Sequence, residues 1–284
     1  MSATMDLTGK LEVANFSDAG QKRARNEDST ASDIKLGFAM IADGMGGYKA
    51  GEVASAIAVS VVMDQVRQWL ATGKPDEVEK TTGYTRGALL LKRAIQDANL
   101  YIFRTANSEP QCHGMGTTAL SVLFYDDRVC VAHVGDSRLY RFRGPAFEQI
   151  TSDHSLVQEL VDRGFLTKEE AVANTPKNLV TRALGIEDRV DVDVIEEKAL
   201  PGDIYLLCTD GLNDMMSDEE IRLTLSKYSA NLVEAGRELV RIANAKGGKD
   251  NISVVLARVL TAFPARTTWY NNILGWLNKG RHSG

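Results

Sequence analysis

The sequence predicts an α+β fold in which two mostly antiparallel β-sheets pack together with helices on their outer sides. Apolar residues recur at helical spacing in two long segments, residues 50–70 and 85–105. Strand-like runs then follow one another without an intervening helix, which indicates antiparallel pairing. A second helical region, residues 217–246, precedes the final strand. Helices at both ends of such a set of strands favour two packed sheets with the helices outside.

Two strands and two helices are expected in the N-terminal part of the chain. Residues 11–17 alternate in polarity, and residues 35–43 form an apolar run that stops at the glycine-rich residues 44–47. The apolar period then becomes helical over residues 50–70, and residues 85–105 carry their apolar side chains on one face.

Three consecutive strands are expected in the middle of the chain, at residues 117–125, 128–134 and 137–143. Short polar turns join them, so the pattern predicts consecutive hairpins. After the flap described next, strands are expected at about 190–196 and 203–209, helices at 217–226 and 231–246, and a last strand at 251–259.

Residues 154–185 differ from their surroundings and are expected to form a small helical flap. Gly164 is placed to end a first short helix, and Thr167 with Glu170 forms a capping-box pattern at the start of a second. The two expected helices are residues 155–164 and 167–174.

Composition is that of an ordinary globular protein. The 284 residues are 44% hydrophobic and 25% charged, and the formal net charge of −5 argues against a nonspecific nucleic-acid surface. Three cysteines lie far apart with no CxxC pair, which favours reduced, buried thiols over a zinc or redox site. The N-terminal residues lack an apolar core and no apolar stretch is long enough for a membrane span, so we expect a cytoplasmic protein.

Aspartates stand repeatedly where an apolar strand meets a glycine or a loop. A single Asp-Gly is as well explained by a turn, but several converging strand ends would form an oxygen-rich cage for Mg²⁺ or Mn²⁺. Two such cations about 3.5–4 Å apart can deprotonate a bridging water near neutral pH, and the hydroxide can attack phosphorus. The segments are RARNED (23–28), IADGMGG (41–47), VGDSR (134–138), CTDGL (208–212) and KDN (249–251).

These segments belong to a longer set of ordered motifs that resembles the metal-dependent protein phosphatases of the type 2C, or PPM, family, and most closely its compact bacterial members. The motifs are SDAGQKRARNEDS, IADGMGGYKAGEVAS, GMGTTAL, HVGDSRLYRFR, ITSDHSLVQEL, NLVTRALG, PGDIYLLCTDGL and KDNISVVL. The match runs from about Leu11 to Arg258, which sets an expected phosphatase domain at 11–260. The resemblance implies an αββα sandwich and the dephosphorylation of phosphoserine and phosphothreonine on proteins.

The resemblance also assigns expected roles to the acidic residues. Asp43 would bridge two Mn²⁺ or Mg²⁺ ions, and Gly44 would offer its carbonyl oxygen to one of them. Asp210 and Asp250 would ligate the other ion, and Asp136 would join Asp210 around a weaker third ion. The expected metal ligands are Glu27, Asp28, Asp43, Gly44, Asp136, Asp210 and Asp250, and the expected catalytic residues are Arg23 and Asp43.

The motifs leave open the role of Arg23 and the identity of the general acid. Arg23 can present two donors to a phosphate, although a solvated basic turn explains it equally well. Met45 stands where several eukaryotic members carry a histidine proposed as the general acid. His154 is an alternative proton donor, but a structural role explains it better, and His133 is expected in the core.

Rival functions are weaker. The glycines of 44–51 follow a strand, but Lys49 stands where a dinucleotide-binding loop needs its third glycine. Residues 155–174 are too acidic for a DNA-reading helix-turn-helix. A pseudophosphatase is disfavoured because every expected ligand type is present, while a small phosphorylated molecule as substrate stays open.

The expected partners are phosphorylated proteins, the substrates of a serine/threonine kinase, and a monomer is expected. Residues 261–284 fall outside the family match and place apolar residues at helical spacing among basic ones. This C-terminal amphipathic tail either docks on a partner or an anionic membrane surface, or packs against its own domain.

Overall fold

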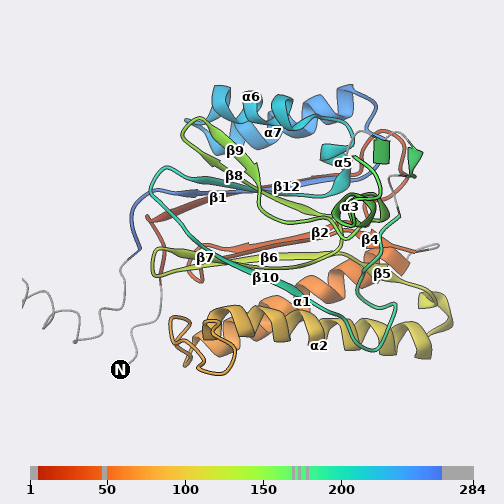
Figure 1. Ribbon diagram of the computed structural model, residues 1–284, viewed down its shortest axis with the longest axis horizontal. Helices are drawn as coiled ribbons and strands as arrows, with labels where there is room; N and C mark the ends of the chain where they lie inside the picture. Colours follow the sequence, from red (N-terminus) through yellow and green to blue (C-terminus); the bar gives the residue numbers. More distant parts are fainter. Residues whose placement is uncertain (1–5, 47–49, 168–169, 172–173, 177–178, 264–284) are drawn as a thin grey trace, which may run out of the picture.

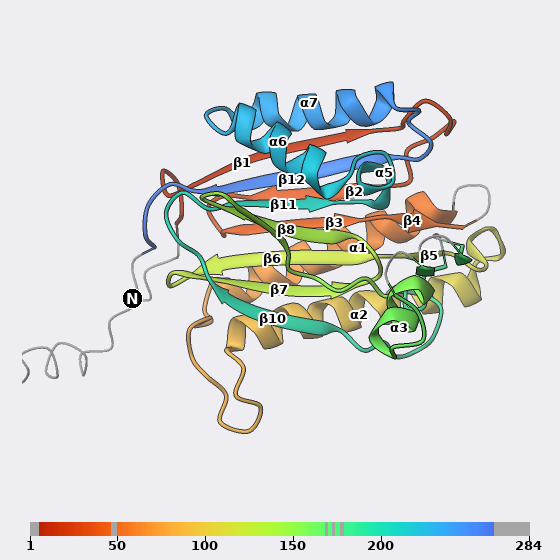
Figure 2. The same cartoon turned by 45° about the horizontal axis from the view of Figure 1, so that its top comes forward.

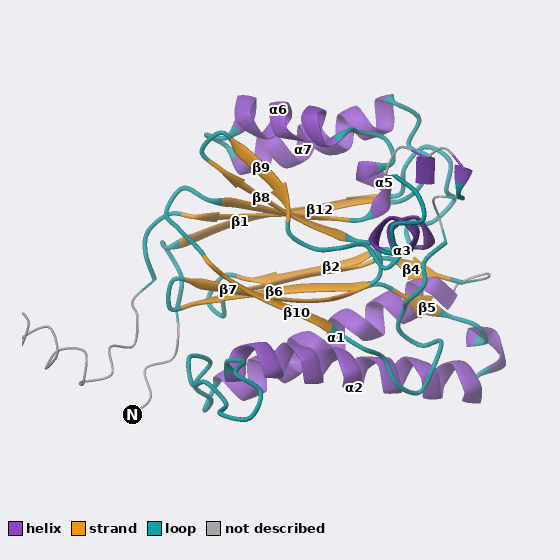
Figure 3. Cartoon of the chain, viewed as in Figure 1, coloured by secondary structure: helices purple, strands orange, loops and turns teal. Residues whose placement is uncertain are grey.

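The computed structural model describes residues 6–46, 50–167, 170–171, 174–176 and 179–263. Within them the chain forms four layers, helices, sheet, sheet and helices, as Figure 1 and Figure 3 show. This arrangement confirms the predicted α+β class and the αββα sandwich.

Each large sheet has five strands, and every neighbouring pair is antiparallel. The first sheet runs in the order β1 (Leu11–Asp18), β12 (Ile252–Val259), β11 (Ile204–Cys208), β8 (Arg138–Arg143) and β9 (Ala146–Gln149). The second runs in the order β10 (Asp193–Lys198), β7 (Arg128–Val134), β6 (Ala119–Tyr125), β3 (Phe38–Ala42) and β2 (Ser29–Asp33). A small third sheet pairs β4 (Gly44–Met45) with β5 (Gly116–Thr117).

Two long helices cover the second sheet and two shorter ones cover the first (Figure 2). The former are α1 (Ala50–Leu70) and α2 (Arg86–Ser108), and the latter are α6 (Asp218–Tyr228) and α7 (Leu232–Ala245). Shorter helical segments are η1 (Pro110–Cys112), α3 (Leu156–Asp162) and α5 (Asp210–Asn213). Each long helix turns an apolar stripe toward its sheet, as the sequence period requires.

Three apolar cores hold the layers together. One lies between α1, α2 and the second sheet, one between α6, α7 and the first sheet, and one between the two sheets. The inter-sheet core includes Leu120, Val131, Leu207 and Val255, none of which is exposed to solvent. Central strands such as β6 are buried on both faces, which explains their continuous apolar sequence.

The predicted run of consecutive hairpins is correct for β6 and β7 but wrong for β7 and β8. The latter two strands belong to different sheets, because β7 pairs with β6 and β10 whereas β8 pairs with β11 and β9. The connection Gly135–Ser137 therefore carries the chain from one sheet to the other. Its short polar sequence looks like a turn, and the sequence does not reveal which strand follows in which sheet.

Two edge strands, β2 and β9, were not predicted. Each is at most five residues long and exposes part of its side chains, so neither carries an apolar run or a clean alternation. They lie at the outer edges of the two sheets.

The flap begins as the sequence predicts. Ser155 accepts the backbone N–H of Gln158 at the start of α3, and Gly164, at a φ of 70°, follows its end. Glu170 and Thr167 exchange the two hydrogen bonds of a capping box. Much of the expected helix 167–174 lies outside the described residues.

Phe263, the last of the described residues, is buried and donates its backbone N–H to Asp127 Oδ1 at 2.6 Å. The rest of the expected tail, residues 264–284, lies outside the described residues. No helix in the described part of the chain combines the length and the apolar character that crossing a membrane requires.

The inter-sheet core makes a prediction about stability. Leu207→Ala should lower the free energy of unfolding by about 2–5 kcal/mol, because it leaves a cavity between the sheets. Leu223→Ala, at a leucine of α6 that is 52% exposed, should change it by less than about 0.5 kcal/mol. Urea unfolding followed by circular dichroism measures both. Equal losses would mean that the inter-sheet core does not carry the fold.

Candidate metal centre

The acidic segments singled out in the sequence meet at one end of the sandwich. In the second sheet the register pairs Ser29 with Ala42 and Ala119 with Val134. The residues that adjoin these positions therefore lie at the same end of the strands. In the first sheet, Cys208 pairs with Arg138 at the corresponding end. The crossover from β7 to β8 connects these ends of the two sheets. Antiparallel pairing and this crossover therefore gather residues that are far apart in the chain.

Asp43 directly follows β3, and two threonines fix its backbone. Thr118 accepts the N–H of Asp43 on Oγ1 at 2.9 Å and donates its own N–H to the Asp43 carbonyl at 2.9 Å. Thr117 Oγ1 donates to the same carbonyl at 2.7 Å. The backbone of Asp43 is thus fully engaged, and its carboxylate is left to face the other acids.

Asp28 lies just before β2, and its carboxylate reaches across to the first sheet. Its Oδ2 accepts hydrogen bonds from Ser253 Oγ at 2.6 Å and Thr209 Oγ1 at 3.0 Å. Its other oxygen, Oδ1, is buried and meets no donor among the described residues. After burial, the charge of Asp28 is the largest cause that raises the pKa of Asp43.

Asp210 opens α5, and Gly211 allows that helix to lie close to the start of β12. A Cβ at Gly211 would stand 2.0 Å from the carbonyl oxygen of Asn251. Oδ1 of Asp210 is buried and has no hydrogen-bond partner in the described part of the chain. Two carboxylate oxygens, on Asp28 and Asp210, are therefore oriented inward with no donor to satisfy them.

Asp250, just before β12, is paired with Arg23. Nη2 of Arg23 donates to Oδ2 of Asp250 at 2.7 Å, and the two side chains are 53% and 29% exposed. The ion pair places Arg23 at the exposed rim of the acidic cluster, where a guanidinium can reach a bound anion.

Glu27 and Gly44 lie against each other beside α1. A Cβ at Gly44 would stand 2.2 Å from the carbonyl oxygen of Gly51 and 2.5 Å from that of Glu27, so only glycine fits. Ser55 of α1 donates to the carbonyl of Glu27 at 2.6 Å. Asn251 accepts the Glu27 N–H at 2.8 Å, so both ends of this residue are held.

Asp136 lies in the crossover between β7 and β8 and is 9% exposed. Burial, followed by the charge of Asp153, raises its pKa to about 6. Asp153 is itself held by Arg138, whose Nη2 donates to it at 2.7 Å.

Burial and mutual repulsion raise the pKa values of the clustered acids. The pKa of Asp43 is held well above its usual range, first by burial and then by the charges of Asp28, Asp210 and Asp136. Burial and then Asp136 raise the pKa of Asp210 to about 8, and burial raises that of Asp28 to about 6.

This donor set fits hard divalent cations. The side chains supply only carboxylate oxygens, two of those oxygens have no donor, and the crowding of negative charge calls for a cation. Desolvated carboxylates that repel one another are costly unless a cation or a proton neutralises them. The residues that could hold such cations are Glu27, Asp28, Asp43, Gly44, Asp136, Asp210 and Asp250.

A cavity of about 390 Å³ opens beside the cluster, between it and the flap. Its lining includes Asp136 and Asp210 together with Val157, Gln158 and Val161 of α3. The acids are thus accessible from a hollow that the flap helps to shape.

Comparison with known proteins decides the family. The model of the family described as "Protein phosphatase 2C" matches residues 19–257 of the chain. The chain belongs to the protein phosphatase 2C family. The resemblance recognised from the motifs is therefore confirmed.

Relatives in this family are serine/threonine phosphatases. The serine/threonine phosphatase stp of Listeria innocua is 37% identical over 242 residues, which cover 84% of this chain and 92% of the relative. The crystal structure of the Mycobacterium tuberculosis phosphatase PstP/Ppp superposes with a TM-score of 0.77 at 37% identity, covering 88% of this chain and 98% of that one. The PstP catalytic domain in complex with two manganese ions gives a TM-score of 0.74 at 37% identity and the same coverage.

Within this phosphatase 2C chain, the sequence identified the acids but missed the residues that hold them. Asn251 donates to the carbonyls of Ala19 and Arg25 and thereby fixes the loop that carries Glu27. Its position in the KDN segment was the available signal. Thr118, which holds Asp43, lies in the GMGTTAL motif, yet nothing in that motif points to a partner 75 residues away.

The raised pKa values predict how chelated protein responds to pH. Folded Asp210 keeps its proton up to about pH 8, whereas in the unfolded chain an aspartate releases it near pH 4. Its stabilising contribution is therefore complete below about pH 4 and is lost as pH rises through 8. In chelator, the melting temperature should fall between pH 7 and 8.5, and Mn²⁺ should reverse the fall.

Asp210→Asn provides the matched control, because its amide carries no charge at either pH. Differential scanning fluorimetry should find a smaller fall in this variant than in the wild type. A wild-type melting temperature in chelator that stays level or rises from pH 7 to 8.5 would contradict the charge crowding.

Proposed function

We propose that the chain removes phosphate from phosphoserine and phosphothreonine residues of proteins, at a pair of Mn²⁺ or Mg²⁺ ions held by the acidic cluster. Its place among serine/threonine phosphatases confirms the enzyme class. The observation that supports the metal chemistry is the set of crowded carboxylates with unpartnered oxygens at the strand ends.

Each acid of the cluster would have a role in metal binding that follows from its position. Asp43 lies centrally, since Asp28, Asp210, Asp136 and Asp250 all raise its pKa, and this favours it as the bridging ligand. A bound divalent pair supplies Lewis-acid charge and makes water nucleophilic near neutral pH. A weaker third ion between Asp136 and Asp210 is supported by the charge that Asp136 places on Asp210.

Arg23 would bind the phosphate of the substrate. It lies at the rim, it is half exposed, and its guanidinium already carries a charge-assisted bond to a carboxylate of the cluster. A planar guanidinium can exchange that single carboxylate contact for two phosphate oxygens.

No histidine of the motifs is placed to protonate the leaving alkoxide. Met45 has no titratable group, and both ring nitrogens of His154 face protein groups, Gly135 and Asp193. We therefore propose that the leaving group takes its proton from water.

We propose that residues 11–260 form the phosphatase domain and that the flap, about 154–185, selects the substrate. The residues of α3 support the second point, since they line the same cavity as Asp136 and Asp210. We further propose a cytoplasmic monomer that opposes a serine/threonine kinase, with the tail 261–284 as a docking segment.

Asp43→Asn should lower kcat by at least about a hundredfold, the order that loss of one stabilising group costs an active site. The assay is Mn²⁺-dependent hydrolysis of a phosphothreonine peptide, with chelator expected to abolish it. Asp64→Asn, on the exposed face of α1, should retain full activity. Activity that persists in chelator would overturn the metal mechanism. Absence of activity with any divalent cation would favour a pseudophosphatase.

Arg23→Ala should raise KM for the phosphopeptide by about 10–100-fold, the range expected for a lost charge-assisted hydrogen bond. Arg23→Lys should fall between it and the wild type, because it keeps the charge and loses the fork. Arg237→Ala, an exposed ion-paired arginine of α7, is the control. If Arg23 serves only to neutralise Asp250, KM will stay constant and only the Mn²⁺ requirement will change.

A further inference from the structure

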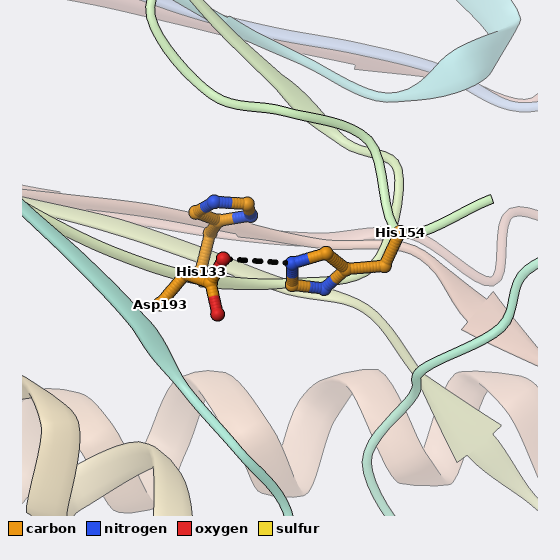
Figure 4. A group of neighbouring side chains, drawn as sticks. All are labelled: His133, His154 and Asp193. Atoms are coloured by element: carbon orange, nitrogen blue, oxygen red, sulfur yellow. Dashed lines mark ion pairs between the residues drawn. The ribbon is translucent and has the colours of Figure 1, made fainter. Parts of the chain in front are cut away.

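A second group of titratable side chains lies outside the acidic cluster, at the start of β10. His133, His154 and Asp193 converge there, and Figure 4 shows the two rings stacked and His154 facing Asp193. The ring centroids are 4.7 Å apart with an interplanar angle of 20°. Both histidines are buried, at 2% and 7% exposure.

The hydrogen bonds of His154 define its tautomer. The backbone N–H of Gly135 donates to Nδ1 at 3.0 Å, so this nitrogen carries the lone pair. Burial and then Arg182 lower the pKa of His154, which leaves the ring neutral at pH 7. The single ring proton is therefore on Nε2, which lies 3.3 Å from Oδ2 of Asp193 and faces that carboxylate.

Arg182 completes the arrangement. Its Nη1 donates to Oδ1 of Asp193 at 2.7 Å and to the carbonyl of Asp191 at 3.1 Å. The same nitrogen is 3.1 Å from Nε2 of His154, a contact between two donors. Asp193 thus accepts a hydrogen bond from Arg182 and places its other oxygen 3.3 Å from Nε2 of His154.

These bonds oppose a metal site, although two histidines and an aspartate are common zinc ligands. A cation can bind Nε2 only if that nitrogen carries the lone pair, and the ring proton must then move to Nδ1. The Nδ1–H would point at the N–H of Gly135, and the hydrogen bond between them would be lost. The cation would also stand beside the guanidinium of Arg182.

His154 instead holds the crossover that carries Asp136. It binds Gly135 twice, because its backbone N–H also donates to the Gly135 carbonyl at 3.0 Å. Gly135 has a φ of 105°, and a Cβ there would stand 2.6 Å from Cγ2 of Thr118. Thr118 is the residue that fixes Asp43. His154 thus supports two acids of the cluster without touching either.

The same histidine contacts the segment that returns from the flap. Thr181 donates its N–H to the His154 carbonyl at 2.8 Å, and Leu184 bridges to Thr117. Arg182, in this segment, is the partner of Asp193. The returning segment and the crossover therefore meet at His154.

We propose that His154, oriented by Asp193 and Arg182, is a positioning residue that sets the affinity of the acidic cluster for its cations. The proposal rests on the proposed metal-dependent function. The imidazole holds the Gly135 amide, and the Asp193 carboxylate keeps the imidazole in the tautomer that can accept it. Groups that hydrogen-bond a metal ligand directly typically change metal affinity by about 10–100-fold when they are lost, and His154 acts one step further out, through Gly135.

Three variants separate the two sides of the imidazole. His154→Asn keeps an acceptor close to the place of Nδ1 and loses the link to Asp193. His154→Gln keeps a donor toward Asp193 and loses the near acceptor. Asp193→Asn leaves His154 in place and weakens its orienting partner, and the side chain it replaces is 47% exposed.

Calorimetric titration of the full chain with Mn²⁺, in the absence of substrate, is the primary measurement. His154→Gln and Asp193→Asn should weaken Mn²⁺ binding by about tenfold, the lower end of the range for groups bonded directly to a ligand, and His154→Asn should recover part of the loss. In turnover, the Mn²⁺ concentration for half-maximal rate should shift likewise, and kcat at saturating Mn²⁺ should return close to wild type.

His133→Phe is the matched control. It keeps a ring in the stack and removes nitrogens that hold no part of the crossover, since Nδ1 of His133 has no partner among the described residues. Its Mn²⁺ affinity should equal that of the wild type.

Wild-type Mn²⁺ affinity in both His154→Gln and Asp193→Asn would overturn the proposal, even if their melting temperatures fall. So would an additional Zn²⁺ ion bound by the wild type and lost in His154→Gln, because it would contradict the tautomer. Calorimetry needs no substrate, so a failure of the phosphatase assay alone would bear on the proposed function and not on this inference.

Discussion

Carboxylate charges crowd at one end of the sandwich, and the surrounding structure holds them there in spite of their repulsion. Burial and the charges of four neighbouring aspartates raise the pKa of Asp43 well above the ordinary value. Two buried oxygens in the group meet no donor among the described residues. Such crowding is costly unless a cation or a proton neutralises the desolvated charge, and above the raised pKa values only a cation can do so.

The fold supplies the rigidity that this arrangement requires. The inter-sheet core fixes the separation of the strand ends that carry the acids, and the crossover at Gly135 connects the end of one sheet to that of the other. Glycines at 44 and 211 let backbone segments approach to distances that a Cβ would forbid. Hydroxyl and amide side chains then orient the acids, as Thr118 does for Asp43 and Asn251 for the loop before Asp28.

The sequence predicted the layers and the acids because both have strong local signals. Helix α1 has its expected bounds, since its apolar period is regular, and Asp43, Asp136, Asp210 and Asp250 each follow or precede an apolar strand. Edge strand β2 was missed because its polar residues carry no pattern, and the β7–β8 crossover because a short polar link has the same appearance within or between sheets. The ion pair of Arg23 with Asp250 joins residues 227 apart, and no local rule predicts it.

Anomalous diffraction from crystals grown with Mn²⁺ tests the central claim most directly. The account predicts two strong manganese peaks about 3.5–4 Å apart. Both should lie within coordination distance of Asp43, with Asp210 and Asp250 on one ion and the Gly44 carbonyl on the other. Absence of manganese from the cluster, or peaks that do not share Asp43, would contradict it.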